Sequence, residues 1–266
     1  MPIAPDGTHF ELTGPKDAPV VVLIHGLGLN KDCWQWTSPA LTDRYRVLIY
    51  NLYGHGTSAA PPEKPDLSLF SRQLADLLDY CEITKATISG FSLGGMIARR
   101  FAQDLPQRTQ ALIILHSPHK RSEEAQAAIL KRVKQARELG PQSTVKAALE
   151  RWFSETFRVA NPELMETVRD WVTANRIEIY HTIYSVLAEG INEIVEPDPA
   201  ITCPTLVITG DEDYGNGPEM THAIANEIKG ATALILPGLR HMALAEAPDT
   251  VNHFIRNFLD KLSLSA

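Results

Sequence analysis

Short apolar runs alternate with segments of helical periodicity along most of the chain. The runs lack the polar alternation of a half-exposed strand, which is typical of strands buried on both faces of a parallel sheet. Between them, apolar residues repeat at helical spacing over residues 70–81 and 251–262. The pattern predicts an α/β fold with a mostly parallel, doubly wound sheet. The expected strands are Val20–His25, Arg46–Asn51, Ala86–Gly90, Ala111–His116, Thr205–Gly210 and Ala231–Leu236.

Residues 118–200 break this alternation, because they show helical periodicity without a convincing strand. The expected helices are Glu123–Leu139, Thr144–Phe157, Pro162–Ala174 and Glu178–Ala188. Helices that only pack on one another would give this pattern. However, an all-helical insertion between two α/β halves favours a different interpretation, in which the helices form a lid that covers a pocket. We therefore expect a core domain of residues 1–117 and 201–266, with a helical lid of residues 118–200.

A glycine-flanked serine follows one of the expected strands. The segment Gly90-Phe91-Ser92-Leu93-Gly94 lies between the strand Ala86–Gly90 and a helical run that begins at Met96. G-x-S-x-G alone is a weak pattern. With a strand before it and a helix after it, the segment is typical of a nucleophile elbow. The serine stands on a sharp turn there, and flanking glycines relieve the crowding of its backbone. Ser92 is the candidate nucleophile.

A serine hydroxyl is a weak nucleophile and needs a base, which in turn needs an orienting acid. In enzymes with a nucleophile elbow, the acid and then the base follow the serine along the chain. The run Thr205–Gly210 is followed by Asp211, Glu212 and Asp213, and the residues alone leave all of these acids open. The last expected strand is followed by His241, the candidate base. A structural role is expected for the remaining histidines: His9, His25, His55, His116, His119, His181, His222 and His253.

The tetrahedral intermediate of such a reaction carries an oxyanion, which needs N–H donors aimed in advance. One donor is expected to be the backbone N–H of Leu93, the residue after the nucleophile. The other is expected from the loop after the strand Val20–His25, where Gly26 and Gly28 let the backbone approach closely. That donor is assigned to Leu27.

Composition narrows the class of protein. The 266 residues carry a formal net charge of −7, which disfavours nucleic acid but leaves an acidic small molecule open as substrate. The three cysteines are widely spaced and indicate neither disulfides nor a zinc site, so buried free thiols are expected. No signal peptide is visible, and no apolar run reaches the ~18 residues that span a membrane. We expect a cytoplasmic protein without metal or organic cofactor, and a homodimer stays open.

Taken in order, these motifs resemble those of the α/β-hydrolase superfamily over essentially the whole chain. They are His25-Gly26-Leu27-Gly28, the loop Asn51–Ser58, Gly90–Gly95, Gly210–Asp213 and Gly238–His241. The resemblance implies the α/β-hydrolase fold and a Ser-acid-His triad. It also implies that Asp213 is the acid, because the family pattern is G-x-x-D, with Asp211 the second choice and Glu212 the third.

The expected lid resembles that of 3-oxoadipate enol-lactonases, which open an enol-lactone ring in aromatic catabolism. The matching segments are Leu149–Phe157 and Asn161-Pro162-Glu163-Leu164. The resemblance implies a small-molecule ester or lactone substrate and a cationic lid residue that meets its carboxylate. Arg151 is the candidate for that contact, and Trp152 beside it is a second candidate substrate-binding residue.

Several positions depart from the family pattern and leave the exact substrate open. Asn51 replaces the usual Asp, Tyr53 replaces the usual Arg, and Pro218 comes five residues after Asp213 instead of four. The segment Ser117–Arg121 differs from the lactonase sequence. The favoured function is ester or lactone hydrolysis through an acyl-enzyme. A general carboxylesterase, a C–C bond hydrolase and a non-catalytic ligand receptor are the alternatives, and the receptor would predict a damaged triad.

Overall fold

The computed structural model describes residues 2–264, in which a seven-stranded sheet forms the centre. The strand order is β1-β3-β2-β4-β5-β6-β7. β1 pairs antiparallel with β3, and every other pair is parallel. The predicted α/β fold is confirmed. The strands are β1 (Phe10–Thr13), β2 (Val20–Ile24), β3 (Arg46–Tyr50), β4 (Ala86–Phe91), β5 (Thr109–Leu115), β6 (Thr205–Gly210) and β7 (Thr232–Leu236).

The strand β1 has no counterpart in the sequence prediction. It is a four-residue edge strand whose side chains are buried only at Phe10 and become exposed by Thr13. A strand this short with so few apolar residues gives no periodic signal. Only its pairing with β3, which places Phe10 opposite Tyr50, identifies it as a strand.

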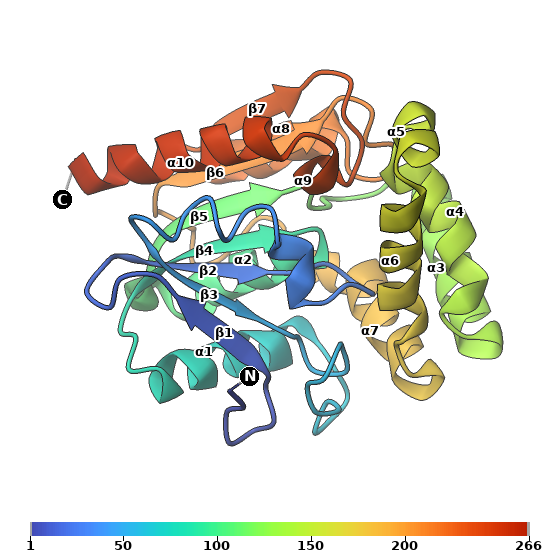
Figure 1. The fold of residues 1–266 in the computed structure, drawn as a ribbon, viewed down its shortest axis with the longest axis horizontal. Helices are drawn as coiled ribbons and strands as arrows, with labels where there is room; N and C mark the ends of the chain where they lie inside the picture. Colours follow the sequence, from blue (N-terminus) through green and yellow to red (C-terminus); the bar gives the residue numbers. More distant parts are fainter. Residues whose placement is uncertain (1, 265–266) are drawn as a thin grey trace.

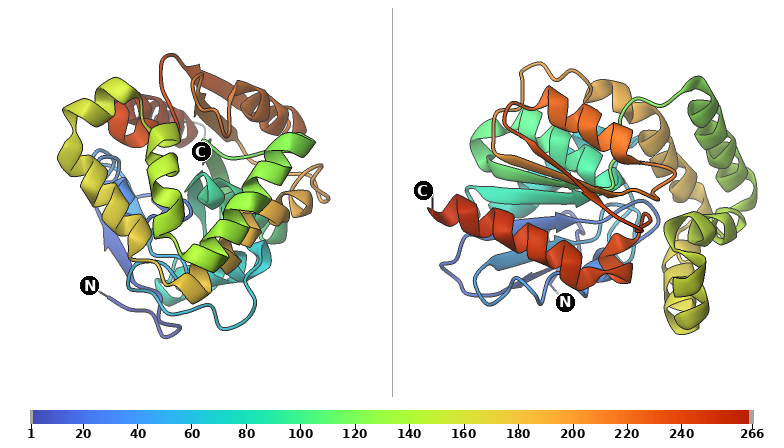
Figure 2. Two further views of the ribbon diagram at one scale, coloured as in Figure 1. Left: turned by 90° about the vertical axis from the view of Figure 1, so that its right-hand side faces the viewer. Right: turned by 90° about the horizontal axis from the view of Figure 1, so that it is seen from above.

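Helices cover both faces of the sheet, as a doubly wound fold requires. The helices α2 (Leu93–Asp104) and α8 (Pro218–Glu227) lie on one face and α10 (Pro248–Leu264) on the other (Figure 2). The helix α1 (Leu67–Tyr80) packs against α2. Its N-terminus is capped by Asp66, whose carboxylate accepts a hydrogen bond from the Leu69 N–H at 2.7 Å. Short helices complete the core: η1 (Lys31–Trp34), η2 (Pro106–Arg108), η3 (Gly190–Glu193) and α9 (Ala243–Glu246).

A helical layer stands at the end of the sheet where β4 and β5 finish (Figure 1). Its helices follow one another between β5 and β6: α3 (Glu123–Leu139), α4 (Gln142–Trp152), α5 (Glu155–Ala160), α6 (Pro162–Thr173) and α7 (Ile177–Glu189). Because active sites of parallel sheets form at the carboxyl ends of the strands, this layer stands over the expected site.

The predicted helix Thr144–Phe157 is wrong in its extent, because the chain breaks between α4 and α5. Phe153 adopts an extended backbone, and Ser154 caps α5 by accepting a hydrogen bond from the Phe157 N–H at 3.3 Å. The break fixes the helical layer to the core, since the Met242 N–H donates to the Trp152 carbonyl at 2.9 Å. Helical periodicity continues across the break, so the sequence does not show it.

Two further expectations concern the state of the cysteines and the absence of a membrane-spanning segment. The three cysteines, all within the described residues, are free thiols, but only Cys33 is buried, whereas Cys81 and Cys203 are half-buried. Across residues 2–264, no helix has both the length and the apolar character needed to cross a membrane. The cytoplasmic location stays a prediction.

Candidate active site

Ser92 occupies a strained turn between β4 and α2. Its φ of 55° and ψ of −114° lie in a region that residues with a side chain rarely adopt. A Cβ atom at Gly90 would lie 2.0 Å from the Gly94 carbonyl oxygen, and one at Gly94 would lie 2.2 Å from the Ile24 carbonyl oxygen. Only glycine fits at both positions, so the sequence G-x-S-x-G is required by the close packing of the turn.

Asp213 lies just beyond β6 and is buried, in contrast to the exposed Asp211. Its Oδ2 accepts a hydrogen bond from the His241 Nδ1 at 2.7 Å. Its Oδ1 accepts from the backbone N–H groups of Gly215 and Asn216 at 3.1 and 3.0 Å. Of the acids that the sequence left open, Asp213 is the one that the structure places against His241.

The other acids of this loop are engaged elsewhere. Asp211 Oδ1 accepts a hydrogen bond from the Gly238 N–H at 2.7 Å. Glu212 pairs with the Arg240 guanidinium at 3.4 Å. Arg240 also donates to the Phe153 carbonyl at 3.0 Å, so this pair helps to hold the helical layer beside His241.

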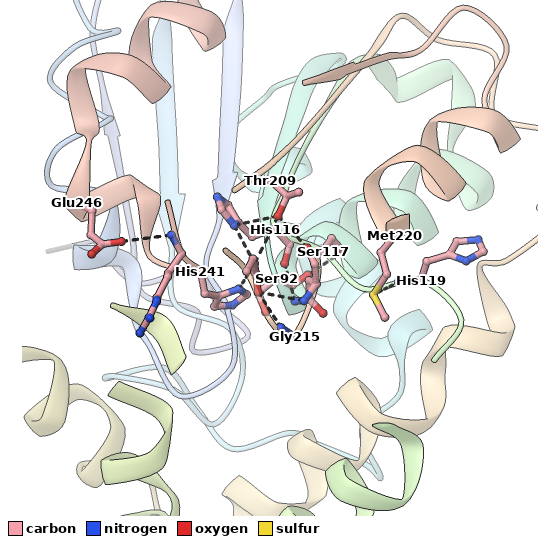
Figure 3. Close-up of polar contacts among 12 residues, drawn as sticks. Ser92, His116, Ser117, His119, Thr209, Gly215, Met220, His241 and Glu246 are labelled. Atoms are coloured by element: carbon pink, nitrogen blue, oxygen red, sulfur yellow. Dashed lines mark hydrogen bonds and ion pairs between the residues drawn. The ribbon is translucent and has the colours of Figure 1, made fainter. Parts of the chain in front are cut away.

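His116 shares the carboxylate oxygen of Asp213 with His241. Its Nδ1 donates to Asp213 Oδ2 at 2.9 Å from the carboxyl end of β5, the strand next to β6 (Figure 3). Its Nε2 is buried without a partner among the described residues. The sequence analysis expected a structural role for His116 and did not predict this contact with Asp213. The signal in the sequence was its place at the end of the strand adjacent to the acid.

The electrostatics of this cluster favour an ionised acid and a neutral second histidine. Burial raises the pKa of Asp213, but the charge of His241 and the hydrogen bonds from His116 and His241 outweigh it and hold that pKa far below its usual value. Burial lowers the pKa of His116 by more than its hydrogen bond to Asp213 raises it. His116 is therefore neutral at neutral pH and acts as an N–H donor.

The loop after β2 is held against the loop after β3 by two buried histidines. His25 Nδ1 donates to the Gly26 carbonyl at 2.8 Å, and its Nε2 accepts from the Leu52 N–H at 3.0 Å. His55 Nε2 accepts from the Gly28 N–H at 3.0 Å. These bonds require neutral imidazoles, because each Nε2 is an acceptor.

The two assigned oxyanion donors, Leu27 and Leu93, flank the serine. A Cβ at Gly26 would lie 3.2 Å from the Ser92 Cβ, so the loop that carries Leu27 passes directly beside the nucleophile. Leu93 is the first residue of α2, directly after Ser92. Neither N–H donates to a protein acceptor within residues 2–264. Both backbone groups are thus available to a bound oxygen.

A pocket joins the serine to the helical layer. Ser92, His241 and Leu27 line its floor, and Arg151 and Trp152 of α4 line its wall. The Trp152 ring lies 6.1 Å from the His241 ring, centroid to centroid. All the residues named from the sequence as candidate site residues therefore lie at this pocket or directly beside it.

Sequence comparison places the chain in a family. The model of the α/β hydrolase fold family matches residues 19–248. The chain belongs to the α/β hydrolase fold family. Its relatives include (E)-2-((N-methylformamido)methylene)succinate hydrolase of Acinetobacter baylyi, 27% identical over 90% of this chain and 90% of that protein. Another is 3-oxoadipate enol-lactonase 2 of the same organism, 27% identical over 96% of this chain and 94% of that protein.

Structural comparison agrees with this assignment. The crystal structure of the enol-lactonase from Burkholderia xenovorans LB400 matches with a TM-score of 0.88 and 26% identity. The match covers 95% of this chain and 96% of that one. The relatives named here are hydrolases, and we therefore assign this α/β hydrolase a hydrolytic activity.

The second histidine of this α/β hydrolase gives a testable prediction. His116→Phe removes one N–H donor from the buried Asp213 carboxylate, so the carboxylate is held less firmly in place against His241. We expect kcat/KM to fall about tenfold or more, the usual cost of a lost hydrogen bond to a charged group. A phenyl ring fills the space of the imidazole but donates no N–H group, so the loss reports on the hydrogen bond.

His116→Asn is the matched variant, because it retains an N–H donor. It should recover most of the rate. Near-normal activity of His116→Phe, or an equal loss of rate in both variants, would contradict a role for the hydrogen bond from His116 to Asp213.

The α/β hydrolase should also lose stability on mild acidification. Burial lowers the pKa of His55 to about 4 and that of His25 well below its usual value. The unfolded chain binds these protons near pH ~6.5, so the free energy of unfolding is highest above that pH and falls between about 6.5 and 4. His55 alone contributes a loss of about 2 kcal/mol by pH 5.

Urea unfolding at pH 7 and pH 5 measures this loss. His55→Gln should flatten the pH dependence, whereas His253→Gln at an exposed position of α10 should leave it unchanged. Equal stability of the unaltered protein at both pH values would contradict the prediction.

Proposed function

We propose that this chain is a serine hydrolase that cleaves a small carboxylic ester or lactone through an acyl-enzyme on Ser92. The observation that carries the proposal is the 2.7 Å hydrogen bond from His241 to the buried Asp213, with Ser92 and His241 on the same pocket. A base held by an ionised acid beside a serine on a strained elbow is the arrangement that acyl transfer needs.

The proposed reaction proceeds in two halves. His241 takes the proton of Ser92, whose Oγ attacks the carbonyl carbon, and the N–H groups of Leu27 and Leu93 stabilise the oxyanion. His241 then protonates the leaving oxygen; in a lactone this oxygen stays attached to the acyl group. A water molecule deprotonated by His241 attacks the acyl-enzyme and releases Ser92.

Among the ester and lactone substrates that the names of its relatives give, we place 3-oxoadipate enol-lactone first. The enol-lactonase relatives match nearly the full length of the chain, and the pocket wall carries a cation, Arg151, that suits a substrate carboxylate. Trp152 offers an apolar surface next to His241 for the carbon skeleton of the substrate. In this proposal the helical layer of residues 118–200 is the lid that roofs the site.

The direct test compares kcat/KM for 3-oxoadipate enol-lactone with that for a neutral p-nitrophenyl ester of similar size. We expect the enol-lactone value to fall within the ~10⁴–10⁸ M⁻¹s⁻¹ of enzymes on their own substrates, and well above the ester value. Good ester turnover with poor lactone turnover would identify a carboxylesterase. Turnover of neither would leave a C–C bond hydrolase or a ligand receptor.

The triad is proposed to work without a metal ion, although His116, Asp213 and His241 place ligand atoms within 4.8 Å of one another. Two ligands of a tetrahedral zinc ion lie about 3.4 Å apart at usual bond lengths. Both histidines instead lie 2.7 and 2.9 Å from one carboxylate oxygen, the lengths of N–H···O hydrogen bonds.

A chelator provides the corresponding prediction. Dialysis against EDTA should leave kcat/KM unchanged, because every proposed step uses protein groups and water. A loss of activity that Zn²⁺ restores would contradict the metal-free mechanism.

A further inference from the structure

Three arginines converge on the pocket that contains Ser92 and His241. Arg121 precedes α3, Arg132 belongs to α3 and Arg151 to α4, and all three side chains line the pocket. Each is half-buried. The sequence prediction named only Arg151, because the packing of α3 beside α4 that brings the others to the same wall cannot be read from periodicity.

None of these arginines has a carboxylate partner within 4.0 Å in the part of the chain that the structure describes. Acids are not scarce, since the chain has 32 Asp and Glu against 25 Lys and Arg. Buried Arg99, by contrast, pairs with Glu227 at 3.0 Å. The pocket therefore concentrates positive charge in a protein whose net charge is negative.

The three guanidinium groups differ in how far the protein already satisfies them. Arg121 donates to the carbonyl oxygens of Leu187 and Ala188 at 3.1 and 3.3 Å, at the negative end of the α7 dipole. Arg132 donates from Nε alone, to the Tyr184 hydroxyl at 3.1 Å. Arg151 donates to no acceptor within residues 2–264. Arg132 and Arg151 thus retain most of their donors for a ligand.

The charges also repel one another. Burial and then the charge of Arg132 lower the pKa of Arg121 to about 10. The same two causes lower the pKa of Arg151. Arg132 therefore lies near both of the others. Arg121, with a pKa still about 10, stays charged at neutral pH, and the repulsion among these guanidinium groups in a half-buried pocket is relieved when an anion binds among them.

We propose that the substrate carries two carboxylates besides the bond that is cleaved, one held by Arg132 and the other by Arg151. This inference rests on the proposed acyl-enzyme at Ser92 and goes beyond it: it ranks dianionic esters and lactones above 3-oxoadipate enol-lactone, which carries a single free carboxylate. A planar guanidinium matches one carboxylate in a two-bond fork, and the two arginines come from different helices. Arg121 donates two hydrogen bonds to the C-terminal end of α7, so it adds positive charge to the pocket and links the start of α3 to α7.

Calorimetric titration of the full chain with unreactive acids tests the proposal. Succinate carries two carboxylates on four carbons, and butanoate carries one on the same number of carbons. We expect succinate to bind at least about tenfold more tightly at fixed ionic strength, since each added charge-assisted pair contributes about that factor. Inorganic phosphate is the third probe; tighter binding of phosphate than of succinate would overturn the two-carboxylate assignment in favour of a single phosphoryl group.

Arginine variants show which side chains bind succinate. Arg132→Gln and Arg151→Gln should each reduce succinate affinity to the level of butanoate. Arg137→Gln, at an exposed position of the same helix α3, should leave it unchanged. Arg132→Lys keeps the charge but loses the two-bond fork, so it should keep part of the preference, which separates lost binding from a folding defect.

Equal affinity for succinate and butanoate, no measurable binding of either, or a preference that survives both glutamine substitutions would overturn the inference. These titrations need no turnover. A protein that binds succinate through these arginines but cleaves no ester or lactone would therefore refute the proposed function and leave the dianion site standing.

Discussion

Ser92→Ala is expected to lower kcat by about 10⁴-fold or more, because it removes the hydroxyl that we propose forms the acyl-enzyme. The loss should appear for lactone and ester substrates alike, and it should leave the fold intact, since alanine is smaller and the elbow is held by its glycines. Steady-state kinetics with the purified variant measure it.

Ser89→Ala is the matched control. Ser89 lies in β4 three residues before the nucleophile, is fully buried, and its hydroxyl has no partner in the described structure. Removing that hydroxyl should change kcat by less than about threefold, because surrounding packing is conserved. Comparable losses in both variants would mean that the effect of Ser92→Ala comes from disturbance of the strand and not from the chemistry.

Asp213→Asn is expected to lower kcat by about 10³–10⁴-fold. An amide carries no charge to stabilise the imidazolium, and it cannot accept hydrogen bonds at both of its ends as the carboxylate does. Asp211→Asn should be nearly silent, because its exposed side chain can still accept the hydrogen bond from the Gly238 N–H.

The pair of variants decides between the acids that the sequence left open. A large loss in Asp211→Asn with near-normal activity in Asp213→Asn would show that Asp211 is the acid and that the assignment to Asp213 is wrong. Circular dichroism of both variants checks that neither substitution unfolds the loop after β6.

The sequence predicted most of the sheet because buried parallel strands are apolar throughout. The strand Thr205–Gly210 has the predicted limits, and others differ by one or two residues at their ends. The strained turn at Ser92 was predictable because it tolerates only glycine at positions 90 and 94. Local backbone constraints of this kind leave a direct mark in the sequence.

The features that escaped prediction depend on contacts between distant segments. The edge strand β1 is defined by its pairing, and the break at Phe153 by the docking of Trp152 onto Met242. His116 approaches Asp213 because β5 and β6 are neighbours, although the residues are 97 positions apart. The convergence of Arg121, Arg132 and Arg151 likewise follows from the packing of α3 beside α4.

Covalent labelling tests the central claim, that Ser92 is the nucleophile of an acyl-transfer site. The protein is treated with a fluorophosphonate, its intact mass is measured, and the adduct is located by peptide mapping. The account predicts one equivalent of label, carried by the peptide that contains Ser92, and none in Ser92→Ala. An unlabelled native protein, or a Ser92→Ala protein labelled as fully as the native one, would contradict it.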